Sequence, residues 1–122
     1  VIVEGQGALN NMFYSGVTLG LIHGCMPDFL IMTHEPYREL DVSDHPIPEL
    51  KELMDLHLDI LKPFKPSIFL GLSLLTLKLE SDIALKYIED AQDDFGLPVT
   101  DLVRFDNNEM IQSIETAMQE WK

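Results

Sequence analysis

The sequence predicts an α/β fold with a mostly parallel sheet of about four strands alternating with helices. Short apolar runs of strand length alternate with longer segments in which apolar residues recur every three or four positions. Strands and helices that alternate in this way are joined by crossover connections, which pair the strands in parallel. The chain of 122 residues, with 46% hydrophobic and 24% charged residues, has the size and composition of one globular unit.

The first half of the chain contains two predicted strand–helix pairs. Residues 1–3 are β-branched and predict a strand, and Ser15 is the predicted cap of a helix that extends to His23. Residues 29–32 are continuously apolar, as expected for a strand covered on both faces. A helix at residues 48–61 follows, because proline suits the first helical turn.

The second half repeats this order. Residues 68–72 predict a third strand, and a helix extends from a Ser81 cap to Gly96, a residue suited to the left-handed position after a helix. Residues 99–103 predict the fourth strand. The last helix is expected to begin at Asp106, because an acid three residues before a glutamate resembles a capping box.

Charge and cysteine content restrict the classes of function. The net charge is −13, from eight Lys and Arg against 21 Asp and Glu, which argues against nucleic acid or an anionic membrane as a partner. The single cysteine, Cys25, cannot form an internal disulfide, and the opening lacks the features of a signal peptide. No apolar run approaches the roughly 20 residues of a membrane span. We therefore expect a cytoplasmic protein that acts on a small molecule.

The sequence begins without methionine, inside a predicted strand. Native domains rarely start in a central strand, so we expect a fragment in which residues 1–122 form one α/β unit of a larger protein. An unpaired strand edge tends to pair with another chain. We therefore also expect the isolated chain to form a homo-oligomer.

The predicted carboxyl ends of the strands are polar, and ligands bind at that edge of a parallel sheet. Glu4 follows the first predicted strand, where P-loop proteins present an acid toward a metal-bound nucleotide or a water. Gly5 and Gly7 flank Gln6 and allow the backbone to pass close to a ligand. A solvated turn glutamate followed by two turn glycines is an equally good interpretation.

A second polar group follows the second predicted strand. His34, Glu35 and Arg38 lie within five residues, so that His34 is a candidate general base and Arg38 a candidate clamp for a carboxylate or phosphate. Arg104, at the end of the fourth predicted strand, offers another anion contact. The alternative for these residues is surface ion pairing worth under ~1 kcal/mol. The histidines show neither HxxxH nor HxxE spacing, so we predict no metal site.

The usual phosphate-binding motifs are missing. The sequence contains no GxxxxGK[ST], and no GxGxxG opens a helix after a strand. A nucleotide site built from this chain alone would lack its phosphate cradle. We expect the chain alone to bind no cofactor.

Two long blocks, residues 4–9 (EGQGAL) and 14–24 (YSGVTLGLIHG), resemble domain-of-unknown-function family 1611. The likeness covers nearly the whole chain in order. Shorter matches are Pro27-Asp28, His34-Glu35-Pro36, Arg38, Ile47-Pro48, Gly71, Ser73, residues 95–99 and residues 101–104. Asn11-Met12 stands where the family commonly has His-Pro, and Leu75 where it usually has Asn.

The resemblance implies a two-domain protein, with a Rossmann-like domain followed by a P-loop NTPase-like domain. This chain would be the C-terminal half of the second domain, with the phosphate loop before residue 1. Some family members are associated with D-glutamate N-acetyltransfer in D-amino-acid catabolism, with acetyl-CoA as donor. By carry-over, the residues lining the site would be Glu4, Gln6, Ser15, Thr18, His34, Glu35, Arg38 and Arg104.

Three hypotheses about function follow. In the first, the full-length protein transfers an acyl group to the amine of a small acidic amino acid, with Arg38 or Arg104 holding the carboxylate and His34 or Glu4 taking the amine proton. In the second, it is an ATP-dependent P-loop kinase or ligase in which Glu4 acts toward ATP-Mg. In the third, the chain by itself is a non-catalytic, self-associating remnant.

Overall fold

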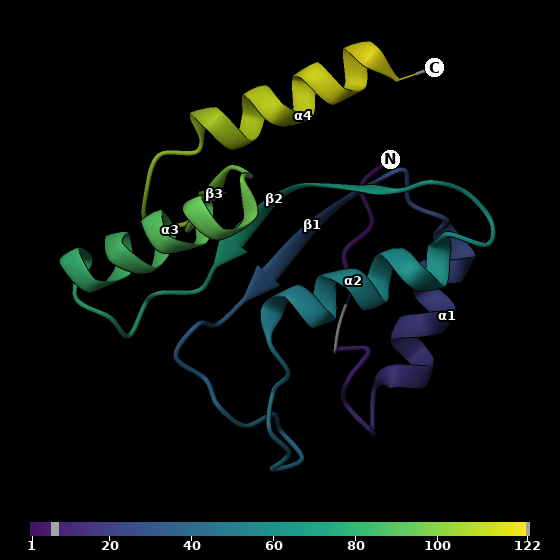
Figure 1. The fold of residues 1–122 in the computed structure, drawn as a ribbon, viewed down its shortest axis with the longest axis horizontal. Coiled ribbons are helices and arrows are strands. Elements are labelled where there is room, and N and C mark those ends of the chain that lie inside the picture. The colour runs from purple at the N-terminus through teal and green to yellow at the C-terminus, as the bar shows by residue number, and fades with distance from the viewer. Residues whose placement is uncertain (6–7, 122) are drawn as a thin grey trace. The chain divides into compact units, whose positions relative to one another are not determined.

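The computed structural model describes residues 1–5 and 8–121 of the chain. Strands and helices alternate along most of the described chain, which confirms the α/β class (Figure 1). The elements in chain order are α1 (Ser15–Cys25), β1 (Phe29–His34), α2 (Leu50–Leu61), β2 (Ile68–Leu74), α3 (Ser81–Phe95), β3 (Val99–Thr100) and α4 (Asn108–Glu120).

The chain divides into two compact units. Unit 1 comprises Val1–Asp28 and Tyr37–Ile68, and contains α1 and α2. Unit 2 comprises Phe29–Pro36 and Phe69–Lys122, and contains the sheet together with α3 and α4.

The sheet has three strands within the described residues, in the order β1-β2-β3. β2 and β3 pair in parallel, with Leu72 opposite Val99 and Ser73 opposite Thr100. The arrows of β1 and β2 point the same way in Figure 1. The parallel arrangement is therefore confirmed, whereas the number of strands is one fewer than the sequence predicted.

Residues 1–3 are the missing strand. They have no regular secondary structure, and Val1, Ile2 and Val3 are all exposed. A run of β-branched residues gives only a preference for extended backbone, and a strand also needs a neighbouring ladder to pair with. The ladder described here is made by β1, β2 and β3, so the prediction for residues 1–3 was wrong.

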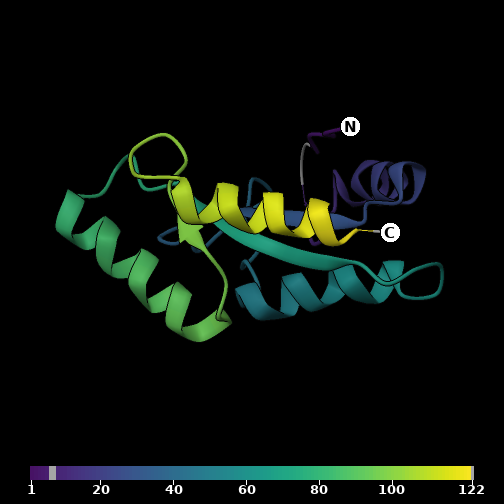
Figure 2. The same cartoon turned by 90° about the horizontal axis from the view of Figure 1, so that it is seen from above.

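The core of unit 2 centres on β2, which is buried from Phe69 to Leu74. A Cβ added at Gly71 would lie 2.3 Å from the Met110 sulfur and 2.9 Å from the Pro98 carbonyl oxygen. Glycine therefore lets the start of α4 approach β2 closely. Further along α4, the Ser113 hydroxyl donates to the Leu70 carbonyl at 2.9 Å, and α4 lies over β2 in Figure 2.

The helix ends agree with the sequence in some places and differ in others. Gly96 ends α3 with a left-handed φ of 63°, as predicted. Ser15 was predicted as a cap but is the first helical residue, because the chain already turns at Asn11, whose carbonyl accepts from the Ser15 N–H at 2.8 Å. Asn107, and not Asp106, precedes α4, since the Asp106 carboxylate accepts from the Asn108 N–H in a local turn.

The other helix and strand ends differ from the predicted ones by a few residues. The second predicted helix begins at Leu50 because Glu49 is extended, with ψ near 140°. β1 and β2 each continue two residues beyond the predicted strands, to His34 and Leu74. β3 ends at Thr100, because Asp101 bends the chain away from the ladder with its own hydrogen bonds to the backbone.

In unit 1, side chains connect the end of α1 to the end of α2. The His23 ring donates from Nε2 to the Ile60 carbonyl at 2.9 Å and packs edge-on against Phe64, with ring centroids 5.3 Å apart. Lys65 donates to the Met26 carbonyl at 2.8 Å and to Asp28 at 2.6 Å. Throughout the described ranges, no helix combines the length and apolar character that crossing a membrane requires.

Candidate active site

The carboxyl edge of the sheet in unit 2 gathers polar side chains from three successive strands. β1 ends at His34, β2 at Leu74 and β3 at Thr100. The residues that follow these strands include Glu35, Thr76 and Asp101. Parallel strands present their carboxyl ends at one edge, which is where ligands bind in open α/β sheets.

His34 is the last residue of β1 and is partly buried. Its carbonyl accepts a hydrogen bond from the Leu75 N–H at 2.8 Å, which ties the end of β1 to the chain leaving β2. Burial lowers the pKa of His34, the nearby Glu35 charge raises it, and burial prevails. The imidazole is therefore neutral near pH 7 and has a lone pair that can accept a proton.

Glu35 forms an ion pair with Lys78, which lies in the loop after β2. The Lys78 Nζ and the Glu35 Oε1 are 3.9 Å apart, and the two side chains are 78% and 22% exposed. The distance is at the limit of an ion pair. The His34 imidazole, the Glu35 carboxylate and the Lys78 ammonium group thus belong to the same edge of the sheet.

Asp101 is the most heavily hydrogen-bonded carboxylate at this edge. It is 2% exposed and accepts from the Thr76 N–H at 3.0 Å and the Thr76 hydroxyl at 2.6 Å, and Thr76 is completely buried. The N–H groups of Val103 and Arg104 donate to its other oxygen at 3.0 and 3.2 Å. Burial alone would raise the pKa of Asp101, but these hydrogen bonds outweigh it and hold the pKa below the usual value.

Arg104 completes this arrangement. Its Nη1 donates to the carbonyls of Thr76 and Leu79, the latter at 2.9 Å, and Nη2 donates to the Ser81 hydroxyl at 3.2 Å. We call Asp101, Thr76 and Arg104 the Asp101 clasp. The clasp fastens the loop after β2 to the loop after β3. Arg104, for which an anion contact was predicted, thus binds protein groups and has a structural role.

The other predicted site residues that the structure describes belong to unit 1. Glu4 is exposed and follows irregular backbone, and not a strand. Gly5 packs near Leu21, with a Cβ there meeting Leu21 at 3.4 Å. Ser15 and Thr18 lie in the first turn of α1, where the buried Thr18 hydroxyl donates to the Tyr14 carbonyl at 3.0 Å.

Arg38 is exposed in the loop of unit 1 that precedes α2, and its Nε donates to the Leu40 carbonyl at 2.8 Å. Gln6 and Gly7 lie outside the described residues. The structure therefore brings His34, Glu35 and Arg104 into one unit, and places Glu4, Gly5, Ser15, Thr18 and Arg38 in the other. The roles predicted for these residues stay predictions.

A family model for the P-loop domain of domain of unknown function 1611 matches residues 1–111. The chain belongs to the DUF1611 family. A crystal structure of a DUF1611 family protein from Anabaena variabilis has 30% sequence identity to the chain and a TM-score of 0.84, and the match covers 93% of this chain and 34% of that one.

Two curated relatives of this DUF1611 chain carry the name D-glutamate N-acetyltransferase. The relative from Tritonibacter scottomollicae is 34% identical over 116 residues, which is 93% of this chain and 35% of the relative. The relative from Pseudoalteromonas sp. is 29% identical over 106 residues, which is 84% of this chain and 32% of the relative. The chain thus spans about a third of the length of the curated relatives it matches.

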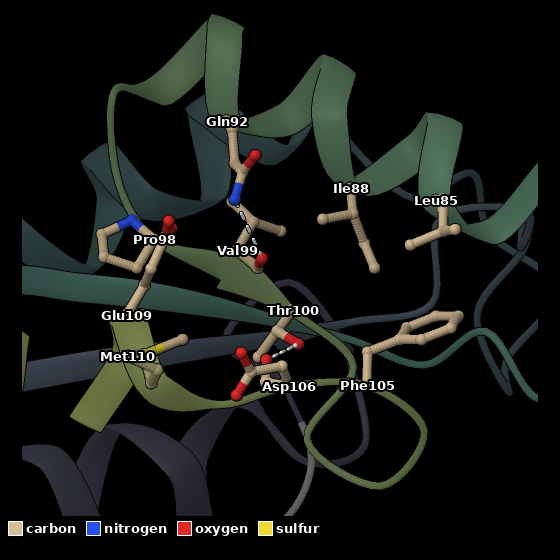
Figure 3. A pocket seen from close by; sticks show the side chains of 10 residues that line it. All are labelled: Leu85, Ile88, Gln92, Pro98, Val99, Thr100, Phe105, Asp106, Glu109 and Met110. Atoms are coloured by element: carbon tan, nitrogen blue, oxygen red, sulfur yellow. Dashed lines mark hydrogen bonds between the residues drawn. The ribbon is translucent and has the colours of Figure 1, made fainter. Parts of the chain in front are cut away.

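A hollow of about 230 Å³ lies in unit 2 between α3, β3 and the start of α4 (Figure 3). Leu85, Ile88 and Phe105 give it a largely apolar wall. Its polar side chains include Gln92, which donates to the Val99 carbonyl at 3.2 Å, and Thr100, which donates to the Asp106 carbonyl at 2.9 Å. We place the candidate site of this DUF1611 chain at the carboxyl edge, because His34 and Glu35 lie there.

Sequence reasoning missed Asp101 and Lys78 as parts of this edge. Asp101 lay inside the strand predicted at residues 99–103. A carboxylate in an apolar run is a sign that the strand ends there, and it could have placed Asp101 at the edge. Lys78 carried no local pattern, since its partner Glu35 is 43 positions earlier in the sequence. Over the described ranges, no group of three or more His, Cys, Asp or Glu side chains is placed to hold a metal ion.

Proposed function

We propose that this chain is part of a small-molecule N-acetyltransferase that moves the acetyl group of acetyl-CoA to the amino group of D-glutamate, in D-amino-acid catabolism. The observation that carries the proposal is the pair of relatives named D-glutamate N-acetyltransferase, which align with 93% and 84% of the chain. Because the chain spans about a third of those relatives, the activity belongs to a protein of their length that contains it, called here the full-length enzyme.

The chemistry needs a base for the acceptor amine. The amino group of D-glutamate is largely protonated near pH 7 and must lose a proton before it can attack the thioester carbon. Attack forms the new C–N bond and a tetrahedral intermediate, whose collapse breaks the C–S bond. The CoA thiolate takes up one proton, so the products are N-acetyl-D-glutamate and CoA.

His34 is the residue of unit 2 that suits the task of the base. Its pKa is lowered by burial, so the ring is neutral at physiological pH and can accept the amine proton. Glu4 is the second candidate; it is exposed and follows irregular backbone. The Asp101 clasp supports the proposal, because it holds the loop after β2 at Thr76. The same loop contacts the end of β1, since the Leu75 N–H donates to the His34 carbonyl.

The direct test is to incubate the full-length enzyme with acetyl-CoA and D-glutamate and to measure the release of free CoA thiol. We expect thiol release with N-acetyl-D-glutamate as the second product, and a much lower rate with L-glutamate. An enzyme that releases no CoA with any acidic amino acid would contradict the proposal. Replacing Glu4 with Gln in the same assay separates the two base candidates.

The family description, a P-loop domain, favours a second candidate function. In it, the full-length protein is an ATP-dependent kinase or ligase that binds ATP-Mg through a phosphate loop outside residues 1–122. ADP formation that depends on D-glutamate, without CoA release, would support this alternative. Because this chain has no GxxxxGK[ST] motif, we expect calorimetric titration of the isolated chain with ATP-Mg to show no appreciable binding.

A further inference from the structure

The hollow between α3, β3 and the start of α4 has a buried, apolar floor. Ile88, Val99 and Met110 line it and are buried, and the whole hollow lies within unit 2. Figure 3 shows the side chains of Leu85, Ile88 and Phe105 directed into the space. Pockets for drug-sized molecules usually measure about 300 to 1,000 Å³, so a hollow of about 230 Å³ suits a smaller molecule.

Carboxylates form the charged part of the wall. Asp106 and Glu109 line the hollow and are exposed, and its ten described lining residues include no Lys, Arg or His. The Asp106 carboxylate is held in place, since it accepts from the N–H and the side-chain amide of Asn108 at 3.0 and 3.1 Å. Each oxygen of a carboxylate can accept a second hydrogen bond. Together with the net charge of −13, this wall repels anions and attracts cations.

The uncharged polar groups of the hollow are also arranged to accept hydrogen bonds. Thr100 uses its one hydroxyl proton for the Asp106 carbonyl at 2.9 Å, which leaves the hydroxyl oxygen as an acceptor. Gln92 donates from Nε2 to the Val99 carbonyl at 3.2 Å, so the position of its amide oxygen, an acceptor, is fixed. A ligand that matches the hollow therefore supplies hydrogen-bond donors.

Arg104 sets the direction in which such a ligand fits. Its guanidinium carbon lies 5.1 Å from the centroid of the Phe105 ring. A cation next to that ring would be repelled by Arg104, whereas an apolar group there would add to the contacts of Leu85 and Ile88. The apolar part of the ligand therefore belongs at Phe105, and its positive charge belongs at the carboxylates.

We propose that the hollow binds a small organic cation, an ammonium group on an apolar alkyl or aryl body. The body lies between Leu85, Ile88 and Phe105, and the ammonium group donates to Asp106 and Glu109. This ligand is distinct from the acidic amino acid of the proposed function, whose carboxylates the same wall repels. It contacts α3, the loop after β3 and the start of α4, so that its binding stabilises folded unit 2.

The test uses three probes of similar size that differ in charge, namely phenethylammonium, phenethyl alcohol and phenylpropionate. Binding to the full-length enzyme is measured by calorimetry without acetyl-CoA or D-glutamate. We expect phenethylammonium to bind roughly 10-fold more tightly than phenethyl alcohol, the lower end of what a hydrogen bond to a charged group contributes, because the carboxylates are exposed. Phenylpropionate should show no binding. Equal affinity for the cation and the anion, or no binding of the cation, would overturn the inference.

Glu109→Gln tests the charge contact, with Glu115→Gln as the matched control. Both glutamates are exposed on α4 and both substitutions remove one negative charge, but only Glu109 lines the hollow. We expect the affinity for phenethylammonium to fall toward that for phenethyl alcohol in Glu109→Gln and to stay the same in Glu115→Gln. Equal losses in the two variants would show a general effect of net charge and contradict the site.

Leu85→Ala tests the apolar wall at a residue that is partly exposed, so the fold should survive. The variant should bind phenethylammonium and phenethyl alcohol more weakly by the same factor, because both lose the same apolar contact. Unchanged affinity for both probes would refute the assigned position of the apolar body.

A competition experiment separates the hollow from the candidate active site. Excess D-glutamate should leave the binding of phenethylammonium unchanged, whereas displacement would place the cation at the acceptor site and overturn the inference. None of these measurements requires acetyl transfer. The cation site therefore stands or falls independently of the proposed function.

Discussion

Two aspartates organise loops in this chain, Asp101 in unit 2 and Asp41 in unit 1. Asp41 accepts hydrogen bonds from the N–H and hydroxyl of Ser43 at 2.8 and 2.7 Å, from the His45 N–H at 3.1 Å, and from the Asn11 amide at 3.0 Å. Asp101 accepts a similar number from Thr76, Val103 and Arg104. The hydrogen bonds are alike, but the surroundings are not.

The difference lies in burial and in what each carboxylate connects. Asp101 is 2% exposed and joins the loops that follow two neighbouring strands, whereas Asp41 is only partly buried and mostly shapes its own turn. An unmatched donor costs far more in a buried site than where water can replace the lost partner. Asp101 therefore supports the frame of the candidate site, while Asp41 gives local order to a loop.

Asp101→Asn should have the largest effect on stability. The amide keeps the size of the side chain but turns a donor toward the Thr76 N–H and hydroxyl or toward the N–H groups of Val103 and Arg104. We expect a loss of about 2–4 kcal/mol in the free energy of unfolding, measured by urea denaturation of the full-length enzyme. Stability within error of the unchanged protein would mean that the clasp is not a structural frame.

Gly71→Ala tests the same unit through packing. The added Cβ would lie 2.3 Å from the Met110 sulfur and 2.9 Å from the Pro98 carbonyl oxygen, and the second of these contacts is with backbone. We expect a destabilisation of about 1–3 kcal/mol. Gly20→Ala in α1 is the control, because nothing lies within 4 Å of its new Cβ, and it should stabilise the helix by up to about 1 kcal/mol. Equal effects of the two substitutions would contradict this account of the core.

The pH dependence of stability separates His34 from the aspartates. The pKa of His34 is lowered from 6.5, so the unfolded chain binds a proton at higher pH than the folded chain does. Stability should therefore fall as pH drops below 6.5, until the folded pKa is passed. The lowered pKa of Asp101 has its effect only in stronger acid, since that contribution is present above the unfolded pKa of about 3.9 and is lost as pH falls through the folded one.

Unfolding curves recorded between pH 7 and 5 measure the His34 contribution, and His34→Gln is the comparison. The substitution should flatten the slope in that range and leave the acid limb below pH 4 in place. A slope that is the same with and without the imidazole would show that burial does not control this histidine.

Asp41→Asn should have the smallest effect. The hydrogen bond from the Ser43 side chain, together with those from His45, Ser43 and Asn11, lowers the pKa of Asp41 to about 2. Its contribution is present above the unfolded pKa of about 3.9 and is lost as pH falls toward 2. We expect a smaller loss of stability than for Asp101→Asn in the same urea assay at pH 7. The opposite order would overturn the comparison of the two aspartates.

The sequence predicted the elements of unit 2 better than the first residues of the chain. β2 was found because its apolar run is buried on both faces, and the end of α3 because Gly96 takes a left-handed conformation. Residues 1–3 have the same apolar character as a strand, but strand formation depends on a neighbour in space, which local sequence does not specify.

For the candidate site, the sequence located His34 and Glu35 because they lie close to the carboxyl end of a predicted strand. It did not reveal that Arg104 binds the carbonyls of Thr76 and Leu79, or that Lys78 pairs with Glu35. Both relations join loops that are 25 to 43 residues apart in the chain. Such contacts follow from the pairing and register of the strands, and no local pattern encodes them.

The central claim is that His34, at the carboxyl edge of unit 2, takes the proton of the acceptor amine. The most direct measurement is kcat/KM for D-glutamate in His34→Gln, with His57→Gln as the matched control, because the His57 ring bonds to the Leu53 carbonyl within α2. We predict that His34→Gln loses a factor on the order of 100 or more, while His57→Gln keeps nearly the full rate. A His34→Gln enzyme as active as the unchanged one would contradict the account.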